Sequence, residues 1–62
     1  MTTSEALKSL KRWYSNFTTK VTRVYNLQGG YAAFAIFEDH SYGWMVKVRY
    51  KRQWIPREDP WA

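Results

Sequence analysis

Cysteine is absent from this sequence of 62 residues, and histidine occurs once, as His40. A disulfide within the chain is therefore excluded, as is a metal site built from thiolates or from several imidazoles. A domain of this length buries only about 60% of the surface that its unfolded chain exposes, so its stability is expected to be marginal. We expect no metal and no other cofactor, and burial of apolar side chains has to supply the stability.

Long apolar runs are also absent. No stretch approaches the roughly 20 consecutive apolar residues that a transmembrane helix needs, and the first residues lack the apolar run of a signal peptide. The sequence therefore predicts a cytoplasmic protein with no membrane partner.

Acidic residues are few and unevenly placed. The formal net charge is +5, and no acid occurs between residues 6 and 37 or between residues 40 and 57. The acids are Glu5, Glu38, Asp39, Glu58 and Asp59. A basic field over the body of a domain attracts polyanions and releases their counterions, so this distribution favours nucleic acid, DNA or RNA, as the partner.

Aromatic residues, by contrast, are abundant. Three Phe, four Trp and five Tyr make up 19% of the chain, and each large ring can remove on the order of 150 to 250 Å² from water. One layer of structure is too small to cover all of these rings. The surplus indicates a partner surface, which includes the option of a second copy of this chain.

The N-terminal region has the pattern of an amphipathic helix from Thr2 to Phe17. Thr2 and Glu5 have the spacing of a capping box, in which each side chain satisfies backbone donors at the start of the helix. Apolar residues recur at helical spacing and form one stripe, while Lys8 and Lys11 fall on the solvent side. The stripe consists of Leu7, Leu10, Trp13, Tyr14 and Phe17.

The rest of the chain predicts strands separated by turns. Lys20–Leu27 is the first strand, Gly29-Gly30 is a turn signal, and Tyr31–Phe37 is an apolar strand without alternation, as expected when both faces are covered or when one face meets a partner. A polar turn at residues 38–41 precedes the third strand. We therefore predict a single α+β domain over residues 1–62, with a helix at 1–17, a three-stranded antiparallel meander at 20–55 and a tail at 56–62, in which Trp61 folds back onto the core. Its predicted centre comprises Leu10, Trp13, Tyr14, Phe17, Val46 and Val48.

Residues 43–51 alternate between apolar and basic side chains. In an extended strand Lys47, Arg49 and Lys51 would share one face and Trp44 and Tyr50 the other. Neighbouring residues on one face are about 6.6 Å apart, close to the spacing of phosphates along a nucleic-acid strand. We therefore predict that this face tracks phosphates and that nearby rings stack on bases. The predicted nucleic-acid-binding residues are Lys47, Arg49, Lys51, Arg52, Arg23, Tyr25 and Trp54.

Catalytic patterns are missing. Asp39, His40 and Ser41 include the residue types of a hydrolase triad, but consecutive residues in a turn cannot easily place the histidine between its two partners. One helix on a small sheet also seldom encloses the several hundred cubic ångströms that a substrate pocket requires. The sequence predicts a protein that is not an enzyme.

Two alternatives from other classes remain open. The first is a small adaptor or inhibitor, of the type found in phages and plasmids, that binds a host protein through aromatic anchors and Arg49 or Arg52. The anchors would be Trp44, Tyr31, Tyr42 and Trp61. The second is a self-assembling structural protein that buries the second face of Tyr31–Phe37 against another copy. The residues match no signature of the ribbon-helix-helix, cold-shock or zinc-finger families, and they leave open the choice between DNA and RNA.

Overall fold

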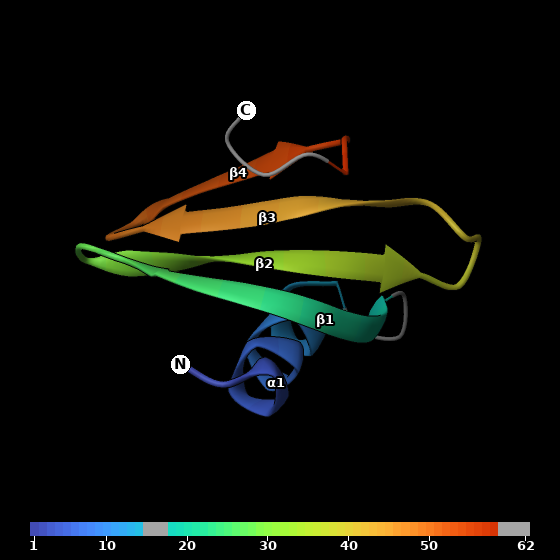
Figure 1. Ribbon diagram of the computed structural model, residues 1–62, viewed down its shortest axis with the longest axis horizontal. Coiled ribbons are helices and arrows are strands. Elements are labelled where there is room, and N and C mark those ends of the chain that lie inside the picture. Colours follow the sequence, from blue (N-terminus) through green and yellow to red (C-terminus); the bar gives the residue numbers. More distant parts are fainter. Residues whose placement is uncertain (15–17, 59–62) are drawn as a thin grey trace.

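The computed structural model of the protein describes residues 1–14 and 18–58. Within these residues one helix packs on a four-stranded antiparallel sheet with strand order β1-β2-β3-β4 (Figure 1). The elements are α1 (Thr3–Tyr14), β1 (Thr18–Leu27), β2 (Gly30–Phe37), β3 (Tyr42–Val48) and β4 (Lys51–Ile55). The predicted α+β class, with a helix on an antiparallel sheet, is confirmed, but the predicted number of strands was wrong.

The additional strand arises because the chain reverses inside the segment that we predicted to be one extended strand. β3 ends at Val48, β4 begins at Lys51, and these two residues pair across a tight turn. Arg49 occupies this turn with a φ of 57°. Glycine, asparagine or aspartate usually mark such a position, because other side chains are strained there. The turn was missed because none of these residue types is present.

The start of α1 is capped as the sequence predicted. The Glu5 backbone N–H donates a hydrogen bond of 3.2 Å to Thr2 Oγ1, and the Ala6 N–H donates to the Thr2 carbonyl at 3.0 Å. The Glu5 carboxylate accepts a bond from the Thr2 hydroxyl, at 3.2 Å. The reciprocal bond of a full capping box is thus replaced by a bond between two side chains. α1 ends at Tyr14, and the predicted end at Phe17 lies outside the described residues.

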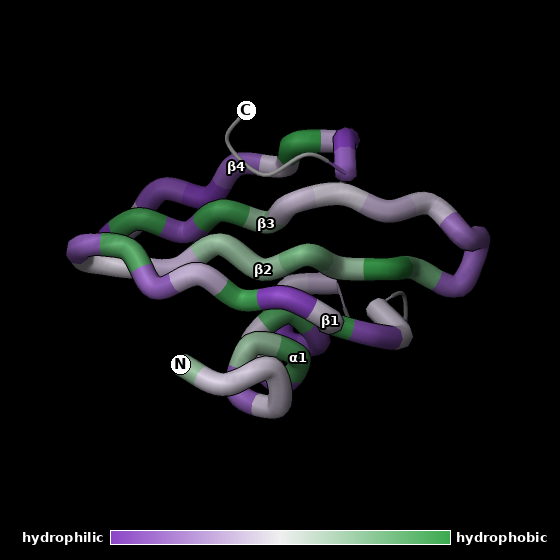
Figure 2. Tube along the Cα trace, in the orientation of Figure 1, coloured by the Kyte–Doolittle hydropathy of each residue, from purple (hydrophilic) through white to green (hydrophobic). Residues whose placement is uncertain are grey.

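One face of the sheet packs against α1 and is called the helix face. The small residues Ala33 and Ala35 of β2 let the helix approach closely, and Leu10 is fully buried between the layers. Tyr31 reaches the helix and donates a hydrogen bond from its hydroxyl to Ser9 Oγ at 2.9 Å. The buried residues on this face are Ala6, Leu10, Val21, Tyr31, Ala33, Ala35 and Met45. Figure 2 shows β2 as a largely apolar strand between hydrophilic turns.

β1 alternates poorly in sequence because its register is irregular. The pairing with β2 shifts between Thr18 and Lys20 and again between Val21 and Arg23. Each shift inserts an extra residue and changes which face the following side chains meet. As a result, Val21 and Val24, three residues apart, both pack into the helix-face core.

The opposite face of the sheet, called the far face, carries a second apolar cluster of Ala32, Phe34, Trp44 and Val46. Our predicted core joined Val46 and Val48 with the helix stripe, and this was wrong, because both valines pack on the far face. Trp13 and Tyr14 lie at the margin of the core rather than in its centre, and Tyr14 is 36% exposed. Alternation identifies residues that share a face, but it does not say which face the helix covers.

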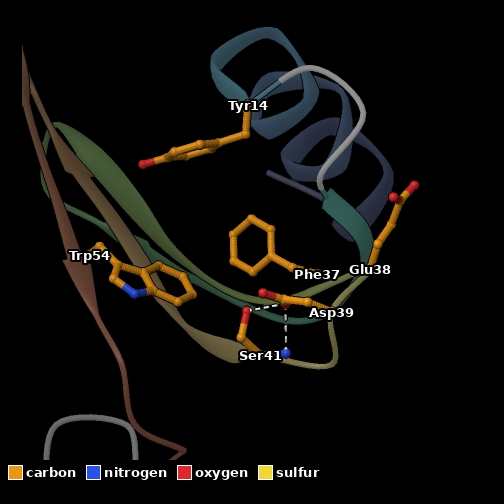
Figure 3. A pocket seen from close by; sticks show the side chains of 6 residues that line it. All are labelled: Tyr14, Phe37, Glu38, Asp39, Ser41 and Trp54. Atoms are coloured by element: carbon orange, nitrogen blue, oxygen red, sulfur yellow. Dashed lines mark hydrogen bonds between the residues drawn. The ribbon is translucent and has the colours of Figure 1, made fainter.

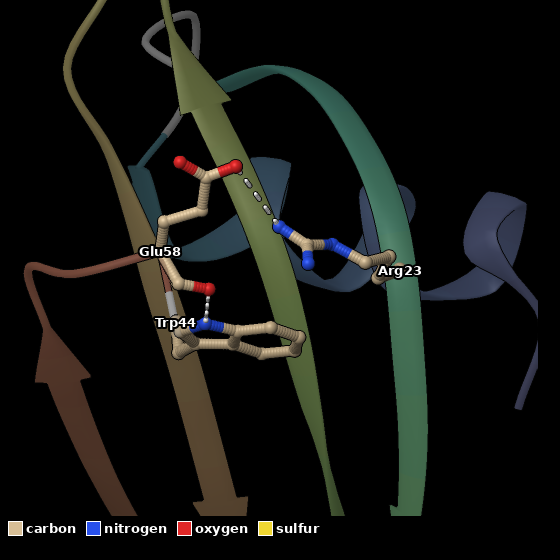
Figure 4. Close-up of polar contacts among 3 residues, drawn as sticks. All are labelled: Arg23, Trp44 and Glu58. Carbon is tan, nitrogen blue, oxygen red and sulfur yellow. Dashed lines mark hydrogen bonds and ion pairs between the residues drawn. The ribbon is translucent and has the colours of Figure 1, made fainter. Parts of the chain in front are cut away.

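The segment after β4 returns across the far face (Figure 4). The Trp44 indole N–H donates to the Glu58 carbonyl at 2.9 Å, and the Glu58 carboxylate lies 3.9 Å from the Arg23 guanidinium. The predicted lid residue Trp61 lies outside the described residues. Of the helices in the described chain, none has the length and apolar character needed to cross a membrane.

Candidate nucleic-acid interface

The seven predicted nucleic-acid-binding residues do not lie on one face of the sheet. The reversal at Arg49 and Tyr50 puts Lys47 and Lys51 on opposite faces and Arg49 in the turn, so the prediction that these three residues share one phosphate-tracking face was wrong. The register places Lys47, Arg52 and Trp54 on the helix face, places Arg23, Tyr25 and Lys51 on the far face, and leaves Arg49 in the turn.

Four of these residues nevertheless remain close neighbours. They belong to the segment Lys47–Arg52, which forms the end of the β3–β4 hairpin and is called the basic hairpin. Lys47 pairs with Arg52, so these two cations lie side by side on the helix face, while Lys51 lies on the far face. The basic hairpin contains no acid. Positive charge therefore surrounds this end of the sheet on both faces and at its tip.

Tyr50 at the tip of the basic hairpin is 100% exposed. It was not among the predicted site residues, because alternation assigned it to an apolar face with Trp44. A single aromatic residue within the run Lys47-Val48-Arg49-Tyr50-Lys51-Arg52 was the signal that could have identified it. Burial of this ring contributes nothing to the folded state, so the ring is available to a ligand.

Arg49 holds the basic hairpin against the neighbouring turn. Its backbone N–H donates to the Gly29 carbonyl at 2.9 Å, and its Cγ lies 3.5 Å from the position that a Cβ on Gly29 would take. The left-handed backbone of Arg49 costs roughly 1–2 kcal/mol for a residue with a Cβ. A bulky charged residue thus occupies a place where glycine would be less strained, and strain of this kind is concentrated at functional sites.

Trp13 of α1 supports the two cations on the helix face. The Arg52 guanidinium carbon lies 4.0 Å from the centroid of the Trp13 ring, and Lys47 Nζ lies 5.7 Å from it. Trp13 itself stacks on Tyr31 with centroids 6.4 Å apart. A guanidinium stacked on an indole keeps its N–H groups free at its edge, in the geometry that binds phosphate. The helix therefore orients Arg52 without neutralising it.

Arg23 and Tyr25 are engaged within the far face. The Arg23 guanidinium lies 4.3 Å from the Phe34 centroid and 5.2 Å from that of Trp44, and Glu58 pairs with it. Tyr25 stacks on Trp44 with centroids 5.4 Å apart and is 42% exposed. Because a carboxylate already lies beside Arg23, this residue is a poorer phosphate anchor than the residues of the basic hairpin.

Trp54 lies near the other end of the sheet, beside a hollow of about 540 Å³ (Figure 3). The described residues that line the hollow are Tyr14, Phe37, Glu38, Asp39, Ser41 and Trp54. The hollow is partly open to solvent, so the fold borders a space of this volume without enclosing it. α1 packs mainly on β1 and to a smaller extent on β2 (Figure 1). Tyr14, the last residue of the helix, and Trp54 of β4 both line the hollow.

The residues considered as protein-binding anchors are unequally accessible. Trp44 and Tyr31 are only 1% and 4% exposed, whereas Tyr42 is 46% exposed. Trp61 lies outside the described residues. The second face of β2 is buried within this chain at Ala32 and Phe34, so a second copy is not needed to cover it.

Among residues 1–14 and 18–58, no three side chains of His, Asp or Glu gather in an arrangement that could hold a metal ion. His40, Asp39 and Ser41 form a polar turn in which Asp39 bonds to Ser41 directly. Comparison with protein-family models, curated proteins and solved structures gave no match to this chain.

Proposed function

We propose that this chain is a non-enzymatic nucleic-acid-binding protein and that the basic hairpin is its contact surface. The observation that carries the proposal is Tyr50, an entirely exposed ring at the tip of a hairpin that contributes four cations and no acid. An exposed ring flanked by Lys and Arg is the combination that binds bases and phosphates together.

The cations provide the electrostatic part of the affinity. Lys47 and Arg52 on the helix face, Lys51 on the far face and Arg49 at the tip contact up to four phosphates. With single strands each contact releases counterions and changes the slope of log K against log salt by about −0.7. The expected slope is therefore about −2.8 for four contacts.

Tyr50 favours single strands over duplexes. A base can stack on this ring only if its own face is free, and the bases of a duplex already stack on their neighbours. Stacking on an aromatic side chain contributes about 1–3 kcal/mol per base. We therefore expect tighter binding to single-stranded DNA or RNA than to a duplex of the same sequence.

The strained backbone of Arg49 allows a specific test of the basic hairpin. Replacing Arg49 by glycine removes a cation and also relieves the left-handed strain, so binding should weaken about tenfold while the protein stays at least as stable. The slope should also become shallower by about 0.7. Fluorescence anisotropy of a labelled oligonucleotide at several salt concentrations measures affinity and slope, and urea unfolding measures stability.

His40 provides the matched control, because its φ of 67° makes it the counterpart of Arg49 in the turn between β2 and β3. His40→Gly relieves similar strain and should leave nucleic-acid affinity unchanged. Lys8→Ala with Lys11→Ala, on the exposed side of α1, controls for loss of charge alone. Its counterpart in the basic hairpin is the double variant Arg49→Gly with Lys51→Ala, which also removes two cations. Equal loss of nucleic-acid affinity in these two double variants would exclude the basic hairpin as the specific contact.

Variants of Tyr50 distinguish the contribution of stacking to the affinity from the contribution of charge. Tyr50→Ala should weaken binding to single strands about tenfold without changing the salt slope, and Tyr50→Phe should bind like the original protein. Absence of binding to any oligonucleotide at low salt would refute the proposed function.

A further inference from the structure

The hollow at the end of the sheet opposite the basic hairpin has aromatic walls. The Phe37 and Trp54 ring centroids are 5.1 Å apart with an interplanar angle of 75°, and those of Phe37 and Tyr14 are 5.9 Å apart at 83°. Phe37 thus stands nearly perpendicular to both other rings. Figure 3 shows the rings of Tyr14 and Trp54 both beside Phe37, with an open space between the three rings. Three rings from α1, β2 and β4 therefore border one space.

The charged residues that line this space are acids, in contrast to the basic body of the domain. Glu38 and Asp39 line it, and none of its described lining residues is basic. The other described acids lie elsewhere, with Glu5 at the start of α1 and Glu58 beside Arg23. In a chain with a formal charge of +5, two adjacent acids at an aromatic hollow are a local reversal that would repel phosphate and attract a cation.

Hydrogen bonds from Ser41 favour the ionised form of Asp39. Its Oδ1 accepts hydrogen bonds from the Ser41 backbone N–H at 2.9 Å and from the Ser41 hydroxyl at 2.5 Å. These bonds, that of the hydroxyl first, lower the pKa of Asp39 below its ordinary value of 3.8. Figure 3 shows its carboxylate turned toward Ser41 near Phe37, whereas that of Glu38 points away from the hollow. Of the two acids, Asp39 is therefore the one that would attract a cation in the hollow at short range.

We propose that this aromatic hollow binds a quaternary alkylammonium group, such as that of choline or of a trimethylated lysine side chain. The faces of aromatic rings carry partial negative charge and attract cations. The apolar methyl groups of a quaternary ammonium match aromatic walls, and the group requires no hydrogen-bond acceptors. A metal ion would need several oxygen or nitrogen ligands, and no suitable group of three exists among the described residues. The volume of about 540 Å³ lies within the usual range for ligand sites.

The test compares a cation with an uncharged molecule of the same shape. Choline and its neutral carbon isostere 3,3-dimethyl-1-butanol are titrated separately, and chemical shifts of the Trp54 indole and the Ser41 amide are followed by NMR. Choline should bind with a Kd in the low millimolar range, and the isostere about two- to fivefold more weakly, since cation–π attraction at a partly exposed site gives about that factor. A trimethyllysine peptide against its unmodified form then distinguishes a protein ligand from a free small molecule.

Variants of the lining residues show which side chains contribute to choline binding. Tyr14→Ala should weaken choline binding about fivefold and Tyr14→Phe should preserve it. Asp39→Asn, which can still accept a bond from Ser41, should weaken it about threefold. Glu5→Gln removes an acid far from the hollow, retains a capping side chain, and should have no effect.

Several outcomes would overturn this assignment. Equal affinity for choline and the isostere would make the hollow a simple apolar surface. The site would be excluded if the chemical shifts stayed unchanged up to about 50 mM choline, a concentration well above the usual range of weak ligands. If choline changed the chemical shifts of the Tyr14→Ala variant as much as those of the original protein, choline would bind at a site other than the hollow. None of these results depends on nucleic-acid binding by the basic hairpin.

Discussion

The two ends of the sheet are built from similar turns but have opposite chemistry. At one end the β3–β4 turn holds Arg49 in a left-handed conformation, and at the other the β2–β3 turn holds His40 in the same way. The first turn contains the exposed Tyr50 and is flanked by cations, whereas the second contains Glu38 and Asp39 and lies beside three aromatic rings. A domain with one overall charge can therefore offer two surfaces of different sign, because charges on opposite ends of a sheet are screened from each other by solvent and salt.

The largest expected effect concerns glycines that let strands approach at each end. A Cβ on Gly30 would lie 1.8 Å from the Lys47 carbonyl oxygen, and one on Gly43 would lie 2.5 Å from the Ile55 carbonyl oxygen and 2.6 Å from the Trp54 ring. Gly30→Ala should lower the free energy of unfolding by about 3 kcal/mol, since it separates the central strands β2 and β3. Gly43→Ala should cost less, because β4 is a short edge strand that can shift.

Urea unfolding of the two variants measures the difference between the ends. Gly29→Ala serves as a control, because the space at Gly29 is adequate and only its φ of 81° is unfavourable. Its expected cost is about 1 kcal/mol. If Gly30→Ala were no more destabilising than Gly29→Ala, close approach of β2 and β3 would not be what requires glycine at position 30.

An intermediate effect is expected when the charge of the acidic end is reversed. The Glu38 side chain points away from the hollow (Figure 3), so Glu38→Lys changes the field there without changing the aromatic walls. Choline binding should weaken about threefold through solvent-screened repulsion. Nucleic-acid affinity should rise by less than that factor, because the new cation lies at the far end from the basic hairpin.

Paired titrations of this variant with choline and with a labelled oligonucleotide test whether the ends act independently. A large gain in nucleic-acid affinity, with a salt slope steeper by about 0.7, would mean that nucleic acid reaches the acidic end as well. That result would abolish the distinction between the two ends.

The smallest effect concerns pH at the β2–β3 turn. Hydrogen bonds from Ser41 lower the Asp39 pKa in the folded state, so the contribution of this carboxylate to stability is present above its ordinary pKa and is lost as the pH falls through the lower, folded-state pKa. Ser41→Ala should raise the Asp39 pKa toward its ordinary value. An NMR titration of the side-chain carboxyl carbon below about pH 5 measures it. An unchanged pKa in Ser41→Ala would show that these hydrogen bonds do not control the carboxylate, and the basic hairpin should be unaffected in either case.

Local sequence patterns determined much of the fold. The helix stripe, the Thr2 cap, the Gly29-Gly30 turn and the apolar strand at 31–37 depend on periodicity and on residues with special backbone preferences, and each could be located from neighbouring residues alone. The excess of positive charge and its interruption at residues 38 and 39 are likewise properties of the sequence.

Tertiary structure decided where these patterns meet. Alternation through residues 43–51 could not reveal the reversal at Arg49, because a strained turn without glycine depends on strand pairing and on the bond to the Gly29 carbonyl for its support. The hollow brings together Tyr14, Phe37 and Trp54 from three separate elements. Periodicity describes the neighbours of a residue along the chain, whereas the side chains that share a face, a turn or a hollow are selected by packing between distant segments.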